Sequence, residues 1–219
     1  LRNKNLSLYG YEKETDKNIR RIPTEGIMFR EHFSPANSTA PSVTSILTGL
    51  YPPNHGILHQ LPYTKESEIE NVEKVKFWLP SFLKEKGYET IAIDWLGQWF
   101  KRGFSYYGEG EYLGRVIAPF KSADEITNLA MLKIDRSQKP FFLFLHYWDT
   151  HFPFPTIKYE KSESEDDLKR TLDGVRSKKE KEYLKVRIAD SGIYTVQSLR
   201  EKYDLSIKVI DEQIGRVYD

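Results

Sequence analysis

The sequence contains no cysteine, only 2 methionines and no long hydrophobic run. The lack of cysteine excludes disulfides, thiolate zinc sites and a cysteine nucleophile, but it does not identify the compartment. The longest apolar run, Phe141–Leu145, is far shorter than the roughly 20 residues that a membrane-spanning helix needs. We therefore expect a soluble domain without a transmembrane segment, in an unknown compartment.

An excess of charge of one sign is also missing. The 33 Lys and Arg residues nearly balance the 32 Asp and Glu residues, so the formal net charge is +1 and predicts no nucleic-acid partner. A chain of 219 residues is long enough to bury a full core. It opens on Leu1 without an initiator Met or the apolar segment of a signal peptide, so we expect a piece of something longer.

The stretch Asn37–Gly56 is predicted to form a polar turn, a short helix and a second turn. The helix should begin near Pro41 and end at Gly49, because proline suits a first helical turn and glycine suits a C-cap. Thr39 then lies at the helix N-terminus, where free backbone N–H groups and the helix dipole favour an anion such as phosphate or sulfate. The alternative is that Thr39 or Ser38 is only an N-cap, a far commoner role for these residue types.

Helix and strand patterns alternate along the middle of the chain. A helical pattern precedes the strand Glu89–Asp94, and a second one, over 122–135, precedes the apolar run Phe141–Trp148, which is typical of a central strand covered on both faces. We therefore expect an α/β fold with a mainly parallel sheet covered by helices on both faces. Ligand groups collect at the carboxyl ends of such strands, where Asp94 and the segment His146–His151 lie.

Several segments between these elements are also assigned from their composition. Asn18–Glu25 is expected to be a short basic helix, and Ile27–Phe33 a strand that delivers the chain to Thr39. The acidic residues within 56–75 indicate a solvated loop. His55 belongs to a Tyr-Pro-Pro-Asn-His-Gly turn and is expected to be structural.

The last third of the chain is more highly charged. We expect exposed helices over about 159–193, inserted into a single domain that spans 1–219, although a partner-binding surface is the alternative. The segment Leu199–Tyr218 carries apolar residues at spacings of three and four, which predicts a helix with one face against the sheet.

A series of short motifs follows a fixed order along most of the chain: Asn5–Tyr11, Ile27–Phe29, Thr39–Gly56, Gly87–Thr90, Arg102–Phe104, Pro140–His151 and Tyr203–Gly215. This series resembles the landmarks of the sulfatase family, within the alkaline phosphatase superfamily. The resemblance implies a doubly covered, alkaline phosphatase/sulfatase-like α/β sandwich, in agreement with the alternation of helices and strands.

The resemblance places Thr39 at the position of the sulfatase nucleophile. In sulfatases this residue is a Cys or Ser that is converted to formylglycine, and it is followed by any residue, Pro, Ser and Arg. Pro41 and Ser42 are in place here, Val43 stands where the Arg would be, and threonine cannot become formylglycine. The chain is therefore similar to superfamily members with an unmodified Thr nucleophile, such as nucleotide pyrophosphatases/phosphodiesterases and phosphoglycerol transferases.

The resemblance also implies that His151 assists the ester oxygen of the substrate. An imidazole with a pKa near neutrality can protonate a leaving group. His146, earlier in the same segment, is a candidate to support it, and either residue is alternatively a buried structural histidine. The candidate substrate-binding residues are Ser42, Asp94 and Asp149, and for Asp149 a turn-forming role is equally natural.

A divalent metal is the cofactor that the resemblance implies. Ca, Mg, Mn or Zn would bind Thr39 and lower the pKa of its hydroxyl. The other ligands of the family lie just before the segment that matches Leu1 and just after the one that matches Asp219, so we expect them outside this sequence. The Lys and His of the family's Lys-Trp-His element are absent from 94–98.

Two classes of function remain open. The first is a hydrolase that acts through Thr39 on a sulfate or phosphate ester of a small molecule or glycan, or a related phosphodiesterase or phosphoglycerol-type transferase. The second is a non-catalytic sulfatase-like domain that keeps the fold for binding. The sequence makes no prediction of oligomeric state.

Overall fold

The computed structural model describes residues 1–109, 112–113, 116–117, 122–152, 154, 157–158, 163–189 and 193–219. The chain divides into two compact units, each described here by itself. The first, the terminal unit, consists of Leu1–Ile27, Phe120–Thr127 and Tyr147–Asp219. The second, the sheet unit, consists of Met28–Pro119 and Asn128–His146.

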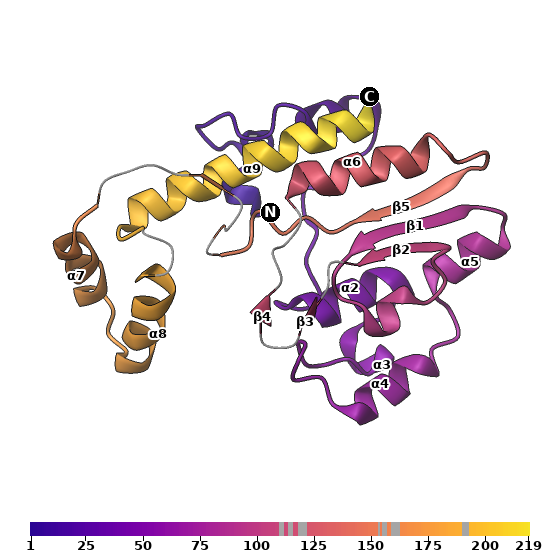
Figure 1. The fold of residues 1–219 in the computed structure, drawn as a ribbon, viewed down its shortest axis with the longest axis horizontal. Coiled ribbons are helices and arrows are strands. Elements are labelled where there is room, and N and C mark those ends of the chain that lie inside the picture. Colours follow the sequence, from indigo (N-terminus) through magenta and orange to yellow (C-terminus); the bar gives the residue numbers. More distant parts are fainter. Residues whose placement is uncertain are drawn as a thin grey trace. The chain divides into compact units, whose positions relative to one another are not determined.

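The sheet unit contains a parallel sheet flanked by helices (Figure 1). Its helices are α2 (Thr39–Thr48), α3 (Pro52–His55), α4 (Glu66–Glu73), α5 (Leu79–Glu85) and the 3₁₀ helix η4 (Gln98–Lys101). Its strands are β1 (Glu89–Asp94), β2 (Tyr106–Glu109), β3 (Tyr112–Leu113), β4 (Val116–Ile117) and β5 (Phe141–Leu145). Helix α6 (Ala123–Ile134) begins in the terminal unit and ends in the sheet unit.

The main sheet has the strand order β2-β1-β5, and both pairings are parallel. Ile91 of β1 is opposite Tyr106 on one side and Leu143 on the other. The central strand is β1, and its Ile91 is completely buried. The expectation that the apolar run of β5 is a central strand is wrong for the described sheet, because β5 is an end strand with an exposed Phe141.

Helices cover both faces of this sheet. On one face, Phe144 of β5 and Tyr107 of β2 pack against the hydrophobic core that includes the buried residues of α2. On the other face, α6 approaches so closely that a Cβ added to Gly108 of β2 would lie 3.4 Å from Leu129. The expected α/β fold is therefore confirmed.

The segment Ile27–Phe33 is not the strand that its composition suggested. Ile27, Phe29 and Phe33 are all exposed, and no described strand pairs with this segment. An apolar alternation favours a strand only where a neighbouring strand accepts its hydrogen bonds and a core takes its side chains.

The connection within 56–75 is not a solvated loop, because it contains α4 and a buried carboxylate. The side chain of Glu68 accepts hydrogen bonds from the backbone N–H groups of Leu58 (2.6 Å) and Lys65 (2.8 Å) and from the ring of His59 (2.9 Å). Burial by itself raises the pKa of Glu68, but these hydrogen bonds outweigh it and hold the pKa below its ordinary value. Glu68 therefore stabilises a turn that the acidic composition did not predict.

The terminal unit is mainly helical. Its remaining elements are η1 (Asn3–Asn5), η2 (Ser7–Tyr9), η3 (Ile19–Arg21), α1 (Ile22–Glu25), α7 (Glu165–Asp173), α8 (Lys178–Ala189) and α9 (Val196–Tyr218). The charged segment 159–193 thus contains α7 and α8, which contact each other, and its description as an insertion stays a prediction. Among the described residues, no helix combines the length and hydrophobicity needed to cross a membrane.

Helix α9 holds the N-terminal segment through carboxylates rather than through apolar contacts alone. Asp204 accepts hydrogen bonds from Asn5 (3.0 Å) and Tyr11 (2.8 Å), and Asp211 accepts the backbone N–H groups of Asn18 and Ile19. Both carboxylates are buried, where they are tolerated because these donors satisfy them. The apolar spacing predicted the helix but not this polar face.

Helix α2 is anchored on both sides. The face of α2 toward the core buries Val43 and Leu47. The helix ends at Gly49, whose φ of 69° is the left-handed C-cap conformation expected from the sequence. The Nε2 atom of His55 lies 3.0 Å from Oγ of Ser45, and His55 is completely buried, in agreement with its expected structural role. The Nδ1 atom of His55 accepts a hydrogen bond from the backbone N–H of Ile57. In a neutral ring the proton is therefore on Nε2.

Replacement of Gly215 by alanine should destabilise the protein, although alanine is the better helix former by about 1 kcal/mol. A Cβ at this position would lie 2.6 Å from Cγ of Asn18, and overpacking of this kind costs about 1–3 kcal/mol. Urea denaturation should therefore give a lower free energy of unfolding for Gly215→Ala. The exposed position Glu212 of the same helix supplies the control, since Glu212→Ala should change this free energy by less than about 0.5 kcal/mol. An unchanged or higher stability of Gly215→Ala would contradict the packing.

The stability of the protein should fall as the pH drops below about 6.5, the ordinary pKa of histidine. Burial lowers the pKa of His55 in the folded state, so below the unfolded pKa the unfolded chain binds the proton more strongly. The contribution of His55 is thus complete above about pH 6.5 and is lost as the pH falls toward the folded pKa, with a slope of at most about 1.4 kcal/mol per pH unit.

The measurement compares wild type with His55→Gln by urea denaturation at about pH 7.5 and about pH 5.5, on either side of the ordinary histidine pKa. The variant lacks the titrating ring, so the stability advantage of the wild type should shrink at the lower pH. If the free energy of unfolding of the wild type exceeds that of His55→Gln by the same amount at both pH values, His55 is not held neutral in the folded state.

Candidate active site

Thr39 is the first residue of α2, which begins earlier than the expected start near Pro41. Thr39 is half-buried, and its hydroxyl forms no hydrogen bond within the described part of the chain. Ser38 has the extended backbone of an N-cap residue, with φ −131° and ψ 154°, but its side chain makes no capping hydrogen bond. Neither side chain therefore caps the helix, and the Thr39 hydroxyl lies at the positive end of the helix dipole.

The backbone beside Thr39 offers fewer donors than the sequence suggested. The N–H of Ala40 donates to Oε1 of Gln60 at 2.7 Å. Pro41 has no N–H, and the N–H of Ser42 is used within the helix. The N–H of Thr39 itself makes no hydrogen bond to the described residues, so one backbone donor rather than several remains for an anion.

The two residues that follow Pro41 have structural contacts. The hydroxyl of Ser42 donates to the carbonyl of Ala36 at 2.9 Å and lies 3.1 Å from the hydroxyl of Ser34, so it holds the turn before α2. Its substrate-binding role stays a prediction. Val43, where the family motif has an Arg, is only 9% exposed and packs in the hydrophobic core, where a charged group would be costly.

Asp94 and His146 meet at the carboxyl ends of β1 and β5. Oδ1 of Asp94 lies 2.6 Å from Nδ1 of His146, and Oδ2 accepts the hydroxyl of Tyr107. The hydroxyl of Tyr107 in turn accepts the N–H of Gly97 at 3.0 Å. The Asp94 side chain is completely buried, and these partners are what make an ionised carboxylate tolerable there.

This arrangement orients the imidazole of His146. A carboxylate only accepts hydrogen bonds, so Nδ1 of His146 is the donor in this contact. The ring of Trp95 is stacked beside it, with the centroids 5.1 Å apart. Sequence reasoning proposed Asp94 and His146 separately and missed Tyr107, since its strand was not predicted, although paired tyrosines favour strands.

His151 lies in the terminal unit, just after β5 in the chain. Its Nδ1 atom donates to the carbonyl of Phe152 at 2.7 Å, and its ring is stacked on Trp148 with the centroids 3.8 Å apart and the planes at 10°. These contacts fix the plane of the ring. His151 is exposed, so the alternative of a buried structural histidine does not apply to it.

Asp149 is completely buried and binds the N-terminal end of α6. Its Oδ1 atom accepts the N–H of Ala123, the first residue of that helix, at 3.2 Å. This contact supports the structural alternative, and the substrate-binding role stays a prediction. The structure therefore brings Asp94 and His146 together within the sheet unit, which also contains Thr39, whereas Asp149 and His151 belong to the terminal unit.

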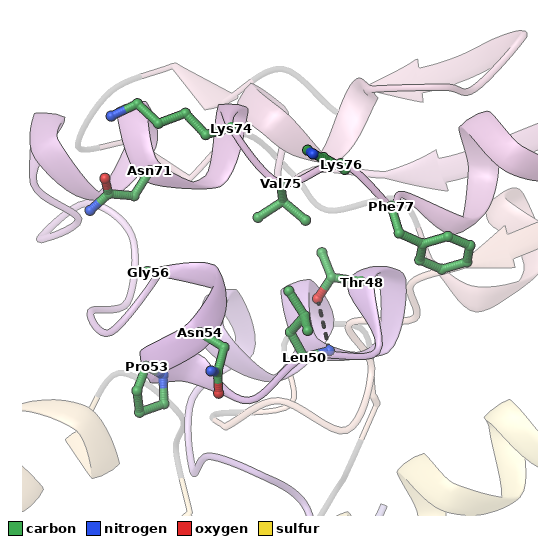
Figure 2. Close-up of a pocket in the computed structure, with 10 residues that line it drawn as sticks. All are labelled: Thr48, Leu50, Pro53, Asn54, Gly56, Asn71, Lys74, Val75, Lys76 and Phe77. Atoms are coloured by element: carbon green, nitrogen blue, oxygen red, sulfur yellow. Dashed lines mark hydrogen bonds between the residues drawn. The ribbon is translucent and has the colours of Figure 1, made fainter.

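Figure 2 shows a hollow of about 520 Å³. Thr48, the last residue of α2, lines it, so it lies at the opposite end of that helix from Thr39. It is lined by Thr48, Leu50, Pro53, Asn54, Gly56, Asn71, Lys74, Val75, Lys76 and Phe77, and none of the predicted site residues lines it. The negative ends of the α2 and α4 dipoles are directed toward it, and Lys74, at the C-cap of α4, offsets that charge. We therefore do not assign this hollow to the chemistry of Thr39.

A metal site was tested against the donor side chains. Among the described residues, no group of three or more His, Cys, Asp or Glu side chains is arranged to hold a metal ion. The described side chains alone therefore do not form a site for the divalent metal that the resemblance implies, and we derive no step through it. The metal stays a prediction.

Curated relatives are sulfatases. The chain is 24% identical over 151 residues to an ulvan-active sulfatase of Formosa agariphila, which covers 65% of the chain and 22% of that protein. It is 21% identical to the N-acetylgalactosamine-6-sulfatase of Rattus norvegicus over 97% of the chain and 43% of that protein. The chain thus spans less than half the length of these relatives.

Solved structures share the fold. A protein in the alkaline phosphatase superfamily from Vibrio parahaemolyticus matches with a TM-score of 0.57 and 18% identity, over 100% of the chain and 47% of that protein. The C-terminal periplasmic domain of EcEptC from Escherichia coli, in complex with Zn, matches with a TM-score of 0.55 and 15% identity, over 99% and 55%. At these identities the likeness establishes the alkaline phosphatase/sulfatase-like fold alone.

The family follows from a match along the whole chain. The model of the family described as Sulfatase covers residues 1–219, and the order of motifs, the parallel sheet with helices on both faces and the curated relatives agree with it. The chain belongs to the sulfatase family.

Proposed function

We propose that the protein is a hydrolase of sulfate or phosphate esters in which the Thr39 hydroxyl is the nucleophile. The observation that carries the proposal is the position of this hydroxyl at the first residue of α2, half-exposed and without a hydrogen bond to the described residues. The positive end of the helix dipole favours the negative charge of the transferred group. The ulvan-active and N-acetylgalactosamine-6-sulfatase relatives support a glycan substrate, and a small-molecule ester is the alternative.

The proposed reaction has two steps. Oγ of Thr39 forms a bond to sulfur or phosphorus while the bond from that atom to the ester oxygen breaks. The hydroxyl proton of Thr39 passes to water, and the departing oxygen takes a proton from the imidazolium of His151. Water then attacks sulfur or phosphorus while the bond from that atom to Oγ of Thr39 breaks. One proton of this water restores the Thr39 hydroxyl, the proton released to solvent in the first step restores the imidazolium of His151, and sulfate or phosphate leaves.

A phosphodiesterase or phosphoglycerol-type transferase is the second candidate. It is favoured by the unmodified Thr39 and by the burial of Val43 where a sulfatase has its Arg. In a transferase, an alcohol takes the place of the attacking water in the second step. A non-catalytic sulfatase-like domain is the third reading, and it predicts no turnover of any ester by the wild type.

Thr39→Val removes the hydroxyl while keeping the shape of the side chain, so it should lower turnover of sulfate and phosphate esters by at least about a thousandfold. Thr39→Ser keeps a hydroxyl at the same place and should retain measurable activity. The assay uses the full-length protein and aryl sulfate, phosphate monoester and phosphodiester substrates, with Ca, Mg, Mn or Zn added in turn. Thr39 is partly solvent-accessible, so both variants should unfold at nearly the wild-type urea concentration.

Activity that survives in Thr39→Val would show that Thr39 is not the nucleophile. Absence of turnover in the wild type on every ester and with every metal would favour the non-catalytic reading. The ester that wild type turns over and Thr39→Val does not identifies the sulfate or phosphate class.

His151→Gln should lower kcat for esters with poor leaving groups more than for esters with good leaving groups. A nitrophenolate leaves without a proton, whereas an alkoxide needs one, and general acid catalysis typically contributes about 10²–10⁴-fold. The measurement is kcat on a nitrophenyl ester and on an alkyl ester of the same acid. His146→Gln is the matched comparison, because it places the same side chain at the other candidate imidazole.

An equal loss on both esters in His151→Gln would contradict its role as the acid. If His146→Gln instead shows the selective loss on the alkyl ester, the Asp94–His146 pair supplies the proton.

A further inference from the structure

The hollow in Figure 2 is bordered by three helices of the sheet unit. Its lining residues come from the end of α2, from α3, and from α4 with the connection that follows it (Figure 2). Gly56, the C-cap of α3, has a φ of 86°, and a Cβ added there would lie 2.7 Å from Cβ of Asn71 on α4. A side chain at position 56 would therefore push α3 and α4 apart, so this glycine helps to shape the hollow.

The buried part of the lining is held by the fold. The hydroxyl of the buried Thr48 donates to the carbonyl of Thr44 at 2.7 Å and accepts the N–H of Leu50 at 3.2 Å, the contact drawn in Figure 2. Val75 is also buried and packs in the hydrophobic core. The hollow is thus preformed, and a ligand would not have to order these walls on binding.

The exposed part of the lining carries polar side chains that the described fold does not use. Asn54 lies on one side of the hollow, and Asn71, Lys74 and Lys76 lie on the other (Figure 2). Within the described part of the chain, the two amide groups make no hydrogen bond and the two ammonium groups form no ion pair. Lys74 offsets the negative end of the α4 dipole, whereas Lys76 follows the helix and has no such role.

These groups define the chemistry of a ligand. Among the described residues that line the hollow, none is acidic, so a cation is not favoured. Lysine attracts sulfate or carboxylate groups, and an asparagine amide both donates to and accepts from hydroxyl groups. The exposed ring of Phe77 offers an apolar face to the C–H groups of a sugar ring.

The size of the hollow and the helix ends favour the same class of ligand. A free inorganic anion would leave the amides and the ring of Phe77 unused, and a volume of about 520 Å³ is in the range of sites for much larger ligands. The last carbonyls of a helix have no partner within the helix and can accept hydrogen bonds from hydroxyl groups. A ligand with several hydroxyl groups and an acidic group therefore matches the whole lining.

We propose that this hollow is a binding site for an acidic oligosaccharide, separate from the site at Thr39. Lys76 binds a sulfate or carboxylate group, Asn54 and Asn71 bind sugar hydroxyl groups, and a sugar ring packs on Phe77. The ten residues of α2 keep the hollow about 15 Å from Thr39 along the helix axis. The inference goes beyond the proposed hydrolysis, because the sugar unit in the hollow is held and not cleaved. The competing reading is that the lysines only offset the helix dipoles and hydrate the surface.

The experiment titrates chondroitin sulfate hexasaccharide into the full-length protein by calorimetry, with the neutral hexasaccharide maltohexaose and inorganic sulfate as comparison ligands. Lys76→Gln removes the charge, and Asn54→Ala removes an amide. Both positions are exposed, so the urea midpoints should stay at the wild-type value. Lys84→Gln, at an exposed position of α5 outside the hollow, is the matched control for the loss of one positive charge.

We expect Lys76→Gln to bind the sulfated hexasaccharide about three- to tenfold more weakly, and Asn54→Ala about two- to tenfold more weakly. Lys84→Gln should bind it like the wild type. Maltohexaose and inorganic sulfate should each bind the wild type at least about tenfold more weakly than the sulfated hexasaccharide, because each uses only part of the lining. Turnover of a nitrophenyl ester should be unchanged in Lys76→Gln.

Failure of the wild type to bind the sulfated hexasaccharide would overturn the proposal, as would wild-type affinity in both Lys76→Gln and Asn54→Ala. Equal affinity for maltohexaose would overturn the acidic class of ligand. A loss of nitrophenyl ester turnover in Lys76→Gln would place Lys76 at the active site and contradict a separate site. Binding is measured without turnover, so a failure of Thr39 as nucleophile leaves these results unaffected.

Discussion

The position of Thr39 depends on the burial of one face of α2. Val43 and Leu47 pack in the hydrophobic core, and the indole of Trp99 donates to the hydroxyl of Thr44 at 2.9 Å. A helix held by packing on one side and by hydrogen bonds to neighbouring elements is a rigid support for a reactive group. Ala40, the second residue of the helix, belongs to the same core, so the backbone beside Thr39 is held while the Thr39 side chain remains half-buried. Val43, where the family motif has an Arg, is part of this buried face.

The second constraint is the parallel sheet, which sets the place of the Asp94–His146 pair. Parallel strands direct their carboxyl ends to one edge, so residues that follow β1 and β5 meet although they are far apart in the chain. Once Asp94 is buried there, its carboxylate must be satisfied, and His146 and Tyr107 do this. The pair is thus a consequence of the sheet topology.

The sequence predicted the features that depend on local pattern. The alternation of helix and strand, the glycine end of α2 and the structural role of His55 all follow from residue types at short spacing. It failed where the partner of a segment decides its structure. The apolar run of β5 indicates that its side chains can be buried, but it does not predict which strands lie beside it. The acidic composition around Glu68 gave no sign that this carboxylate is buried and accepts hydrogen bonds from backbone N–H groups. Gln60 gave no signal, because its hydrogen bond joins residues 20 positions apart.

The central claim is that Thr39 carries the transferred group, and the most direct measurement is mass spectrometry of the full-length protein quenched during turnover. The peptide that contains Thr39 should carry one sulfuryl or phosphoryl group, and the Thr39→Ser variant should carry it on the new serine. A group found on another residue, or an unmodified Thr39 in a protein that releases its alcohol product in a burst before steady turnover, would contradict the claim.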